Sequence, residues 1–563
     1  MEKATLAGIK YLATLTSEER RRHGTVYTPA HLVAYIFELA GYPGNGEPPL
    51  LLDPCCGAGA FLEHAVQLLA DSLRGQGLDL RKASGRATFL QSVSCSLFGV
   101  DLDPTACALA RVAVRDAVAR KTLQKPPASF FEDNVLQADF LRPNQQGLPP
   151  AFDFIVGNPP YVSTETMSDE AKLLLRQQYT TARGRFDLYG IFIERSLELL
   201  RPGGRLAMIT PDKFLTSQTS RPLRELMLSH ARLRKVARFR SHRTFAAAAT
   251  VPCITVLERG GEAEDFELLD CVGSQEDARV HVAARSQRSL RGLTSAPWNL
   301  AAPALEGLAA RIKSWHPTLA ARTWRMSAGL ATGRDELFVL PGGGIEVESE
   351  LLQPAVRGRD LRPFRIDDPE LNLLLPYRFD ELGSPQLVDL KHFPKAAAYL
   401  EQHRSELTAR HCVRVWGKAW YDLHDTPVAD LRRQKKILVP DVARTNRFVA
   451  DEGNYFPLHS VYYLIPRRPT ELHFLTAVLN SEPIEFLIRL RAPIVKDGFS
   501  RFRKQFLAPL PLPELPDREA EALVSLASED WPGFNDRIYA LFQLGRREIA
   551  TIRKFLTERN QVD

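Results

Sequence analysis

The stretch that decides the fold of this chain is Phe152-Asp153-Phe154-Ile155-Val156-Gly157-Asn158-Pro159-Pro160-Tyr161. Its first half is β-prone and is bounded by turn residues, so the sequence predicts a buried strand that ends in a rigid loop. Two consecutive prolines fix φ near about −65° and push Asn158 into an extended conformation. The prolines lack N–H groups but keep their carbonyls. The loop therefore presents two acceptors, the Asn158 side-chain oxygen and the Pro159 carbonyl, beside the ring of Tyr161.

This pair of acceptors suits a planar NH2 group on an aromatic ring. The lone pair of such an amine is delocalised into the ring, which makes the nitrogen a poor nucleophile. Two acceptors that bind both amine hydrogens would draw the nitrogen toward tetrahedral geometry, and a neighbouring ring would hold the base by stacking. The alternative is an ordinary proline-stiffened turn after a strand, and the stretch alone leaves both interpretations open.

Three further apolar runs end at acidic residues, and each is followed by turn or helix signals. They end at Asp53, before Pro54-Cys55-Cys56-Gly57-Ala58-Gly59, at Asp101 and at Asp139. Glycines at the carboxyl end of a strand let a ligand approach the backbone, and an acid at the end of the second strand is the usual partner of a ribose diol. Asp53 could instead cap a helix. Strands that alternate with helices predict an α/β fold with a doubly wound, Rossmann-like parallel sheet.

Composition places the chain among globular proteins of two or three domains. It has 563 residues, a net charge of +6 and a pI near 8.9, which permits a polyanionic partner. Its seven cysteines include no Cys-x-x-Cys pair, which favours a reducing compartment and predicts neither a zinc site nor a disulfide framework. No apolar run reaches membrane-spanning length. We therefore expect a cytoplasmic protein without a bound metal and without a membrane partner.

The periodicity of the sequence changes after the strand at 251–257. Residues 261–300 are acidic and then polar, and are predicted to connect two domains. Residues 301–515 show short β-prone segments with aromatic clusters and basic runs, typical of a mixed α+β domain. Helical periodicity returns over 516–563. Eight lysines and arginines between Arg221 and Arg243 face one acid, and either a solvated helix face or phosphate contact would explain them.

Taken together, these segments resemble the N6-adenine DNA methyltransferases of the gamma arrangement, the TaqI-like group. The resemblance covers residues 23–257 and rests on an ordered set of motifs. It implies that Asp101 takes the ribose hydroxyls of S-adenosylmethionine and that Asp139 contacts the cofactor's adenine. The full set of implied cofactor-binding residues is Tyr27, Thr28, Pro29, Asp53, Pro54, Cys55, Gly57, Gly59, Asp101, Leu102, Asp139, Phe140 and Asn158.

The same resemblance implies a catalytic set around the opening stretch. It comprises Asn158, Pro159, Pro160 and Tyr161, together with Phe245 at the position where the family places a second ring against the flipped base. The alternative for Phe245 is a purely structural role, as a core ring ahead of the Val251 strand. Adenine would leave the base stack because its N6 cannot be reached inside a duplex.

The resemblance extends more weakly into the second half of the chain. Gly329–Asp335 and Leu507–Pro513 look like pieces of the family's C-terminal target-recognition domain. The implied organisation is a methyltransferase domain over 1–260, a connector over 261–300, a DNA-recognition domain over 301–515 and a helical segment over 516–563. The implied partner is double-stranded DNA. We expect a monomeric modification enzyme of a bacterial or archaeal restriction-modification or related defence system, for which a separate restriction endonuclease is a candidate partner.

Other functions remain open at this stage. An Asn-Pro-Pro-Tyr loop would also suit the N4 amine of cytosine in DNA, an RNA guanine or a protein glutamine. Asn rather than Ser at position 158 argues against cytosine. Methyltransferases of this kind that act on RNA guanine or protein glutamine are usually much shorter, so the long second half of this chain argues against both. A catalytically idle DNA-binding protein is a further possibility, against which the intact Asp53, Asp101 and Asn158 argue.

Overall fold

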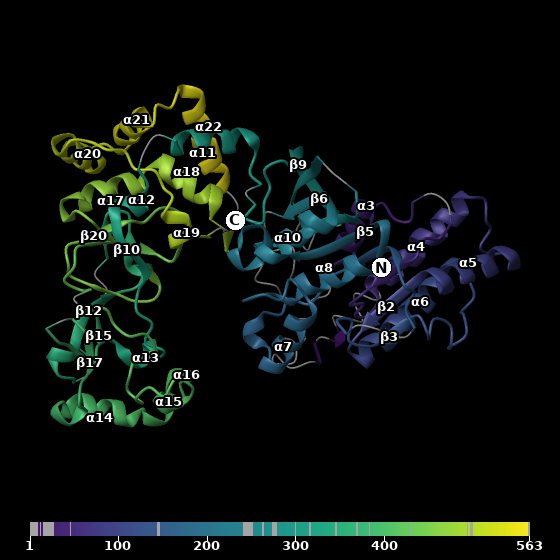
Figure 1. Ribbon diagram of the computed structural model, residues 1–563, viewed down its shortest axis with the longest axis horizontal. Helices are drawn as coiled ribbons and strands as arrows, with labels where there is room; N and C mark the ends of the chain where they lie inside the picture. Colours follow the sequence, from purple (N-terminus) through teal and green to yellow (C-terminus); the bar gives the residue numbers. More distant parts are fainter. Residues whose placement is uncertain are drawn as a thin grey trace. The chain divides into compact units, whose positions relative to one another are not determined.

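The chain forms two compact units, Met1–Leu300 and Ala301–Asp563 (Figure 1). The expected site residues Tyr27 and Phe245 lie outside the described residues. The computed structural model describes residues 10–11, 13–14, 28–44, 47–142, 147–239, 251–261, 264–272, 279–298, 300–314, 317–343, 346–367, 370–381, 383–429, 431–492, 494–495 and 499–560.

The first unit is built on a nine-stranded sheet in the order β3-β2-β1-β4-β5-β7-β6-β8-β9. The strands from β3 to β5 are parallel, as the sequence predicts. Beyond β5 the sheet is mixed, because β7 runs antiparallel to both of its neighbours. The strands are β1 (Leu51–Asp53), β2 (Leu97–Asp101), β3 (Val135–Gln137), β4 (Phe152–Gly157), β5 (Leu200–Pro211), β6 (Ala231–Phe239), β7 (Pro252–Arg259), β8 (Asp265–Val272) and β9 (His281–Ser289).

Helices cover both faces of this sheet because successive strand residues point to opposite sides. Leu51 and Val156 join one buried cluster, whereas their neighbours Leu52 and Ile155 join the other. The first cluster packs against α3 (Ala30–Ala40), α4 (Ala60–Gly75), α5 (Ala83–Ser96) and α6 (Pro104–Thr122). The second packs against α7 (Asp169–Gln178), α8 (Leu188–Leu199), α9 (Lys213–Thr216) and α10 (Arg221–His230). The fold is therefore a doubly wound, Rossmann-like α/β sandwich.

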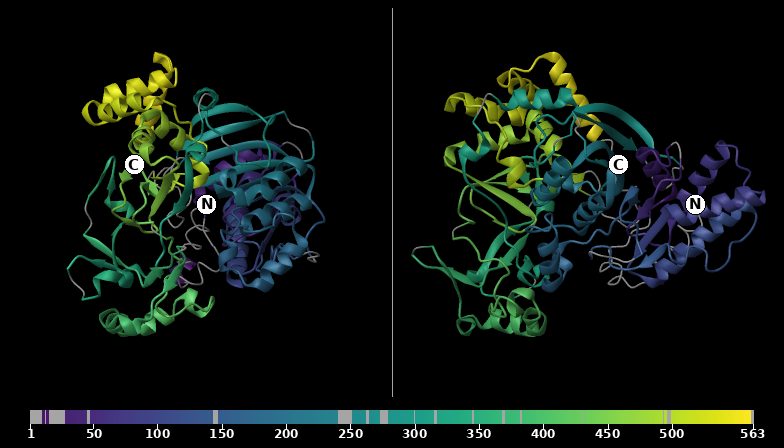
Figure 2. Two further views of the ribbon diagram at one scale, coloured as in Figure 1. Left: turned by 60° about the vertical axis from the view of Figure 1, so that its left-hand side comes forward. Right: turned by 45° about the vertical axis from the view of Figure 1, so that its right-hand side comes forward.

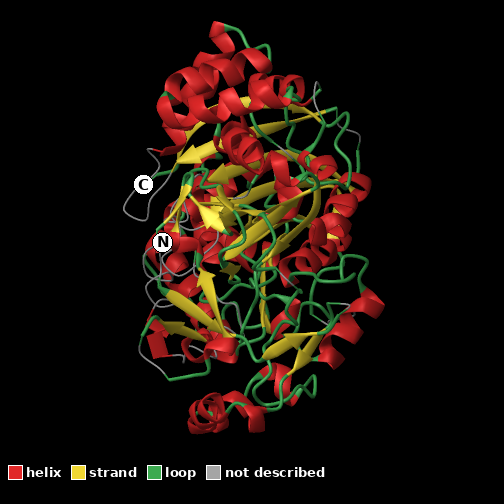
Figure 3. Ribbon diagram, turned by 90° about the vertical axis from the view of Figure 1, so that its left-hand side faces the viewer, coloured by secondary structure: helices red, strands yellow, loops and turns green. Residues whose placement is uncertain are grey.

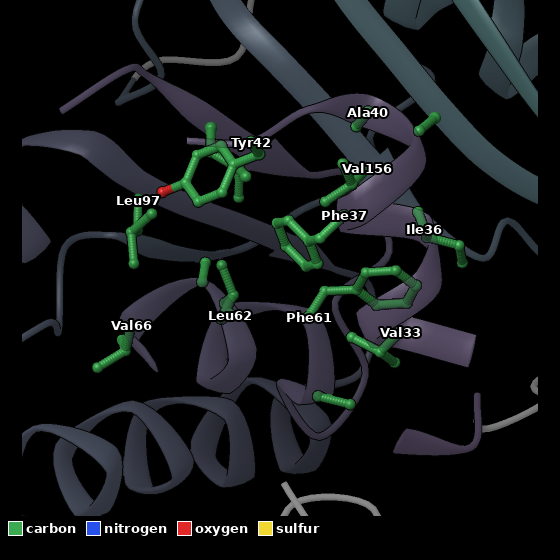
Figure 4. Packing of buried hydrophobic residues seen from close by; sticks show 14 of the residues in the cluster. Val33, Ile36, Phe37, Ala40, Tyr42, Phe61, Leu62, Val66, Leu97 and Val156 are labelled. Atoms are coloured by element: carbon green, nitrogen blue, oxygen red, sulfur yellow. The ribbon is translucent and has the colours of Figure 1, made fainter. Parts of the chain in front are cut away.

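Helix α3 is fixed to the sheet by an aromatic cluster. The buried Phe37 ring lies 5.2 Å from the Tyr42 ring and 6.2 Å from the Phe61 ring of α4. Figure 4 shows these rings together with Val156 of β4. The guanidinium of Arg205 on β5 also donates to the Ala40 carbonyl at 3.0 Å. These contacts fix the C-terminal end of α3 against the sheet, and Thr28 lies just before the opposite end of the same helix.

Residues 261–300 are predicted to connect the two domains, but in the structure they contribute strands to the first unit. They carry β8 and β9, which extend the sheet of the first unit, and Trp298, which is 1% exposed. The backbone N–H of Trp298 donates to the Leu215 carbonyl at 2.6 Å. The polar composition that suggests a linker arises because β9 is an edge strand whose side chains mostly face solvent.

The second unit contains two four-stranded sheets, ordered β10-β22-β18-β20 and β11-β15-β12-β21. Smaller pairings involve β13 with β14, β16 with β17, and β19-β24-β23. The strands are β10 (Thr323–Ala328), β11 (Val339–Pro341), β12 (Leu352–Val356), β13 (Leu361–Arg362), β14 (Arg365–Ile366), β15 (Leu371–Leu374), β16 (Tyr377–Phe379), β17 (Pro385–Leu387), β18 (Lys436–Pro440), β19 (Val442–Ala443), β20 (Val449–Asp451), β21 (Phe456–Pro457), β22 (Val461–Pro466), β23 (Ile494–Val495) and β24 (Phe499–Arg501).

Helices gather at the two ends of the second unit, with strands between them (Figures 2 and 3). Within the described range 517–560, three helices pack on the buried cluster that also contains α17 (Leu472–Asn480) and α18 (Glu482–Arg491). None of the helices in the described part of the chain combines the length and apolar character that crossing a membrane requires. The helices are α11 (Pro303–Lys313), α12 (Leu319–Arg322), α13 (Asp335–Phe338), α14 (Pro394–Gln402), α15 (Arg404–Thr408), α16 (His411–Arg414), α17 (Leu472–Asn480), α18 (Glu482–Arg491), α19 (Lys504–Leu507), α20 (Asp517–Glu529), α21 (Trp531–Leu541) and α22 (Arg546–Asn560).

A buried ion pair joins β18 to β20 inside the second unit. Lys436 Nζ lies 2.6 Å from Asp451 Oδ2, and both side chains are fully buried. The ammonium also donates to the carbonyls of Arg432 and Gln434 at 3.0 and 3.1 Å. Asp451 accepts from backbone N–H groups, including that of Asn454 at 2.8 Å. The pair is therefore satisfied on both sides, although desolvation lowers the pKa of Lys436.

We predict that Lys436→Met lowers the free energy of unfolding by about 3–5 kcal/mol, because it leaves the Asp451 carboxylate buried without a counter-ion. Urea denaturation of the purified protein measures this change. Lys435→Met is the matched control: its partner Glu452 lies 2.5 Å away, but both side chains are more than 40% exposed. The control should cost no more than about 1 kcal/mol. Equal losses for the two variants would contradict the buried pair.

Candidate functional site

The candidate site lies along the carboxyl ends of four neighbouring parallel strands. In the order β3, β2, β1 and β4, these ends carry Asp139, Asp101, Asp53 and Asn158. Strand pairing aligns Asp101 with Gln137 of β3 and Asp53 with Gly99 of β2. The sheet therefore brings the four residues that the sequence singles out to a single edge. This edge is where open α/β sheets bind ligands.

Asp53 is the most deeply buried of these groups. Its side chain is fully buried, and its Oδ1 accepts from the Cys55 N–H at 3.2 Å. Its Oδ2 has no hydrogen-bond partner among the residues the structure describes. Desolvation, with Asp101 nearby, raises the pKa of Asp53. An unsatisfied buried carboxylate oxygen is costly, and a cationic or N–H-bearing ligand at this edge would satisfy it.

The end of β4 passes so close to Asp53 that a side chain at position 157 would have to displace the Asp53 carboxylate. A Cβ atom on Gly157 would lie 2.9 Å from Asp53 Oδ1 and 3.3 Å from Pro54 Cδ. The absence of a side chain lets Asn158 follow directly beside the end of β1. Packing against Asp53 therefore explains why a glycine precedes Asn158, and the sequence alone does not reveal this reason.

Asp101 organises the glycine loop through its carboxylate. Oδ2 accepts from the Gly57 N–H at 2.8 Å and Oδ1 accepts from the Asp103 N–H at 2.9 Å. Burial raises the pKa of Asp101, and the two backbone hydrogen bonds oppose that rise. Gly57 has a positive φ of 51°, a conformation that glycine adopts without strain. The expected ligand acid thus also fixes the loop that would surround the ligand.

Asp103, two residues after Asp101, was not among the site residues predicted from the sequence. Asp103 caps α6, with Oδ1 accepting from the Thr105 N–H at 2.8 Å, and its Oδ2 accepts from the Tyr11 hydroxyl at 2.5 Å. The Asp-Pro-Thr order at 103–105 is a helix-start signal that could have identified the cap. Between the two acids, the Leu102 side chain is 60% exposed. It is therefore available to pack against a flat ring.

Asp139 and Phe140 differ in what they can offer a ligand. Asp139 Oδ1 accepts from the Leu141 N–H at 3.1 Å, while Oδ2 lies 3.5 Å from Arg142 Nε with its side chain 45% exposed. The Phe140 ring is 4% exposed and stacks on Phe192 of α8 at 5.4 Å. A ligand contact from Phe140 would therefore come through its backbone rather than its ring.

Asn158 is tied to the N-terminal motif across 130 residues. Its Nδ2 donates to Thr28 Oγ1 at 3.1 Å, and Thr28 is buried. Pro29 follows as the N-cap residue of α3. This hydrogen bond uses the amide nitrogen and so directs Oδ1 away from Thr28. The Thr28 motif near the N-terminus therefore orients the side-chain amide of the Asn158 motif.

Tyr161 is anchored at its far end. Its hydroxyl donates to the Ile209 carbonyl of β5 at 3.3 Å, and burial raises the pKa of the phenol. The ring itself is only partly covered. Pro159 is buried and Pro160 is half-buried between Asn158 and this ring. The loop therefore holds an aromatic surface beside the Asn158 amide.

Cys55 sits within the glycine loop as a thiol. Desolvation, together with the charges of Asp53 and Asp101, raises its pKa. A thiol held in its neutral form is a weak nucleophile, so Cys55 lines the site rather than reacting in it. No group of three or more His, Cys, Asp or Glu side chains within the described ranges is arranged to hold a metal ion.

Comparisons with known proteins find one matching family in each of the two units of the chain. Residues 95–245 match the Eco57I restriction-modification methylase family, and residues 353–512 match the TaqI-like C-terminal specificity domain. The Type II methyltransferase M.BstVI of Geobacillus stearothermophilus is 27% identical over 96% of this chain and 100% of its own length. The Type II methyltransferase M.XhoI of Xanthomonas vasicola is 29% identical over 94% of this chain and 99% of its own.

Solved structures show the same fold at low sequence identity. The Type IIL restriction-modification enzyme MmeI, solved in complex with DNA, matches with a TM-score of 0.62 at 13% identity over 98% of this chain and 77% of its own. A DrdV–DNA complex matches with a TM-score of 0.56 at 12% identity over 93% of this chain and 59% of its own. The chain therefore carries an Eco57I-like restriction-modification methylase domain followed by a TaqI-like C-terminal specificity domain, and it is similar over nearly its whole length to Type II methyltransferases.

Proposed function

We propose that this protein is a site-specific DNA methyltransferase that transfers a methyl group from S-adenosylmethionine to the N6 atom of a flipped-out adenine. The observation that carries the proposal is the end of β4, where Asn158 is held by Thr28 beside the Asp53 carboxylate and ahead of the anchored Tyr161 ring. It is proposed to act as the modification component of a restriction-modification or related defence system, as its relatives' names suggest.

The strand ends fit the chemical groups of the proposed cofactor. Asp53 offers a buried carboxylate oxygen to a cationic group, Asp101 offers its carboxylate to a ribose diol, and Leu102 offers an exposed apolar surface to a purine. Asp139 is exposed enough to accept from the purine amine. Bound there, the cofactor would supply an electrophilic sulfonium methyl group and would leave as S-adenosylhomocysteine once the methyl–sulfur bond breaks, while the methylated amine loses one proton to solvent.

The loop at Asn158 would then prepare the nucleophile. Asn158 Oδ1 and the Pro159 carbonyl accept the two hydrogens of the adenine amine, which localises the nitrogen lone pair. The Tyr161 ring stacks on the base and offsets part of the cost of removing it from the duplex, at about 1–3 kcal/mol per stacked base. Most of the rate enhancement would come from this positioning. The amine needs no strong base before attack because it is neutral and its partner is a cation.

Phe245 remains proposed as the second ring against the flipped base, and Tyr27 as part of the cofactor contact; both lie outside the described residues. The second unit is proposed to bind double-stranded DNA, since base readout needs a surface beyond the catalytic loop. The second candidate function is methylation of another planar NH2 group, such as the N4 amine of cytosine. It is favoured only by the fact that the two acceptors would bind any such group.

The deciding experiment is to express the protein in a host without methyltransferases and to sequence its DNA for modified bases. N6-methyladenine at one short recurring sequence is the expected result. N4-methylcytosine in its place would establish the second candidate. Unmodified DNA from cells that contain folded, cofactor-binding protein would overturn the proposal.

We predict that Asn158→Ala retains cofactor affinity but loses methylation by more than tenfold. Although the resemblance also counts Asn158 among the cofactor contacts, the main effect of the substitution is to remove an acceptor that acts on the transition state. Calorimetry with S-adenosylmethionine and a methylation rate measured on the same preparation separate these effects. A rate above about a tenth of the wild-type value, a loss worth only ~1.4 kcal/mol, would contradict the assigned role of the loop.

We predict that Asp101→Ala weakens cofactor binding by about 1.5–3 kcal/mol, the scale of a hydrogen bond to a charged group. Calorimetric titration gives the affinity, and anisotropy with labelled duplex in the absence of cofactor gives the control. Because the carboxylate also holds Gly57 and Asp103, the circular dichroism melt of the variant is needed as well. A loss of DNA affinity equal to the loss of cofactor affinity would mean that Asp101 is structural.

Tyr161 allows its ring and its hydroxyl to be tested separately. Tyr161→Phe removes only the hydrogen bond to Ile209, and should cost about 0.5–1.5 kcal/mol of stability with little change in rate. Tyr161→Ala removes the stacking surface and should lower kcat/KM by about 5- to 150-fold. Steady-state kinetics on a duplex with one target site compares them. If the Phe variant is as slow as the Ala variant, the ring is not a stacking platform.

A further inference from the structure

The second unit carries an exposed aromatic feature that the proposed catalytic site does not use. Residues 410–425, which we call the Trp416 loop, include Val415 and Trp416, which are 64% and 53% exposed. The indole edge is flanked by the rings of His411 at 5.4 Å and His424 at 4.9 Å. The loop contains α16 and lies near α13 and α15 (Figure 1). Large apolar side chains exposed next to each other on a surface commonly mark an interaction site.

The Trp416 loop is held in place by a buried arginine. Arg410 is 6% exposed, and its guanidinium donates to the carbonyls of Leu407, Thr332 and Trp420 at 3.0, 3.1 and 2.8 Å. It also lies over the Phe338 ring, 5.2 Å from the centroid. One cation thus joins three backbone segments. The indole is therefore presented by a rigid support rather than by a free loop.

The support fixes the Trp416 loop to the motif Gly329–Asp335, which sequence analysis singled out. The His424 N–H donates to the Thr332 carbonyl at 3.1 Å and the Asp425 N–H donates to the Ala331 carbonyl at 3.0 Å. The Ala331 N–H donates in return to Asp425 Oδ2 at 2.9 Å. The exposed Gly333 and Arg334 of this motif therefore belong to the same surface as Trp416.

The charges on this surface favour an anionic partner. Arg334 and Arg414 are exposed, and neither forms an ion pair with any residue that the structure describes. The facing carboxylates are mostly engaged: Asp335 lies 3.9 Å from His459, Asp425 lies 3.1 Å from His424 and Asp422 lies 3.6 Å from Lys418. Glu336 is the exposed acid beside them. Two exposed guanidinium groups thus belong to the same two joined segments as the exposed indole.

We propose that the Trp416 loop is a DNA-contact element, in which Trp416 packs against a base or sugar while Arg334 and Arg414 bind backbone phosphates. The proposal rests on the proposed function and adds to it which residues of the second unit contact the duplex. Arginine and an aromatic ring together are a common means of holding nucleic acid, because the cations bind phosphate and the ring packs against a sugar or against the face of an unstacked base. Arg410 is a positioning residue in this arrangement.

The test compares two exposed tryptophans of the second unit. Trp416→Ala is measured against Trp324→Ala, since Trp324 is 51% exposed but lies on β10 outside the Trp416 loop. Fluorescence anisotropy uses a labelled duplex that contains the sequence methylated by the wild-type protein. Trp416→Ala should bind about 5- to 150-fold more weakly, the worth of one stacked base, whereas Trp324→Ala should bind as the wild type does. Both variants should melt at the wild-type temperature because both side chains are exposed.

Salt dependence separates the arginines from the ring. Arg334→Gln and Arg414→Gln should each reduce the slope of log affinity against log salt by about one, while Trp416→Ala should leave the slope unchanged. Wild-type affinity and slope in Arg334→Gln, Arg414→Gln and Trp416→Ala alike would overturn the proposal, and would leave a protein partner as the occupant of this surface. An equal loss in Trp324→Ala would also overturn it.

The outcome for the wild-type protein keeps the two proposals apart. If the wild type methylates DNA while Trp416→Ala binds the duplex with unchanged affinity, only the role of the Trp416 loop fails. If the wild type neither binds nor methylates any duplex, although it binds S-adenosylmethionine, the proposed function fails and the Trp416 loop loses its proposed partner with it.

Discussion

The close approach of β4 to the Asp53 carboxylate is the constraint on which the candidate site depends. With no side chain at position 157 to displace the Asp53 carboxylate, the backbone carries Asn158 directly beside the end of β1. The same carboxylate is buried with one oxygen left for a ligand. A side chain at position 157 would push against the carboxylate that is proposed to face the cofactor. Transfer between two bound groups requires them to lie within reach of each other, so this contact of two strands matters more than either motif alone.

Around that contact, the fold fixes each polar group from a second element. The Asn158 amide is oriented by Thr28, the glycine loop by Asp101 and the Tyr161 ring by the Ile209 carbonyl. The second unit follows the same rule, since Arg410 binds three backbone segments beneath the exposed Trp416. Groups held in this way lose little entropy when a partner binds. Both units therefore present rigid polar and aromatic surfaces rather than flexible loops.

The prediction from sequence was most successful where a local pattern has one structural solution. Apolar runs that end in acids or in Asn-Pro-Pro became the parallel strands β1 to β4, because burial on both faces demands such runs. It was wrong for 261–300, where the polar edge strand β9 resembles a linker until its hydrogen bonds to β8 are known. It also missed Asp103 and Tyr11, whose contact spans 92 residues and leaves no local pattern.

The sequence by itself determined the class of fold, the strands that end in acids and the kind of methylase and specificity domains that the chain resembles. These follow from local periodicity and from motifs whose residues are neighbours in the chain. Only the tertiary structure decided that Phe140 turns its ring into the core, that Asp101 holds the glycine loop and that Trp416 stands exposed on a support built from Thr332 and Arg410. Each of these depends on contacts between residues distant in sequence, and the energies of such contacts are set by burial and geometry that exist only once the chain has folded.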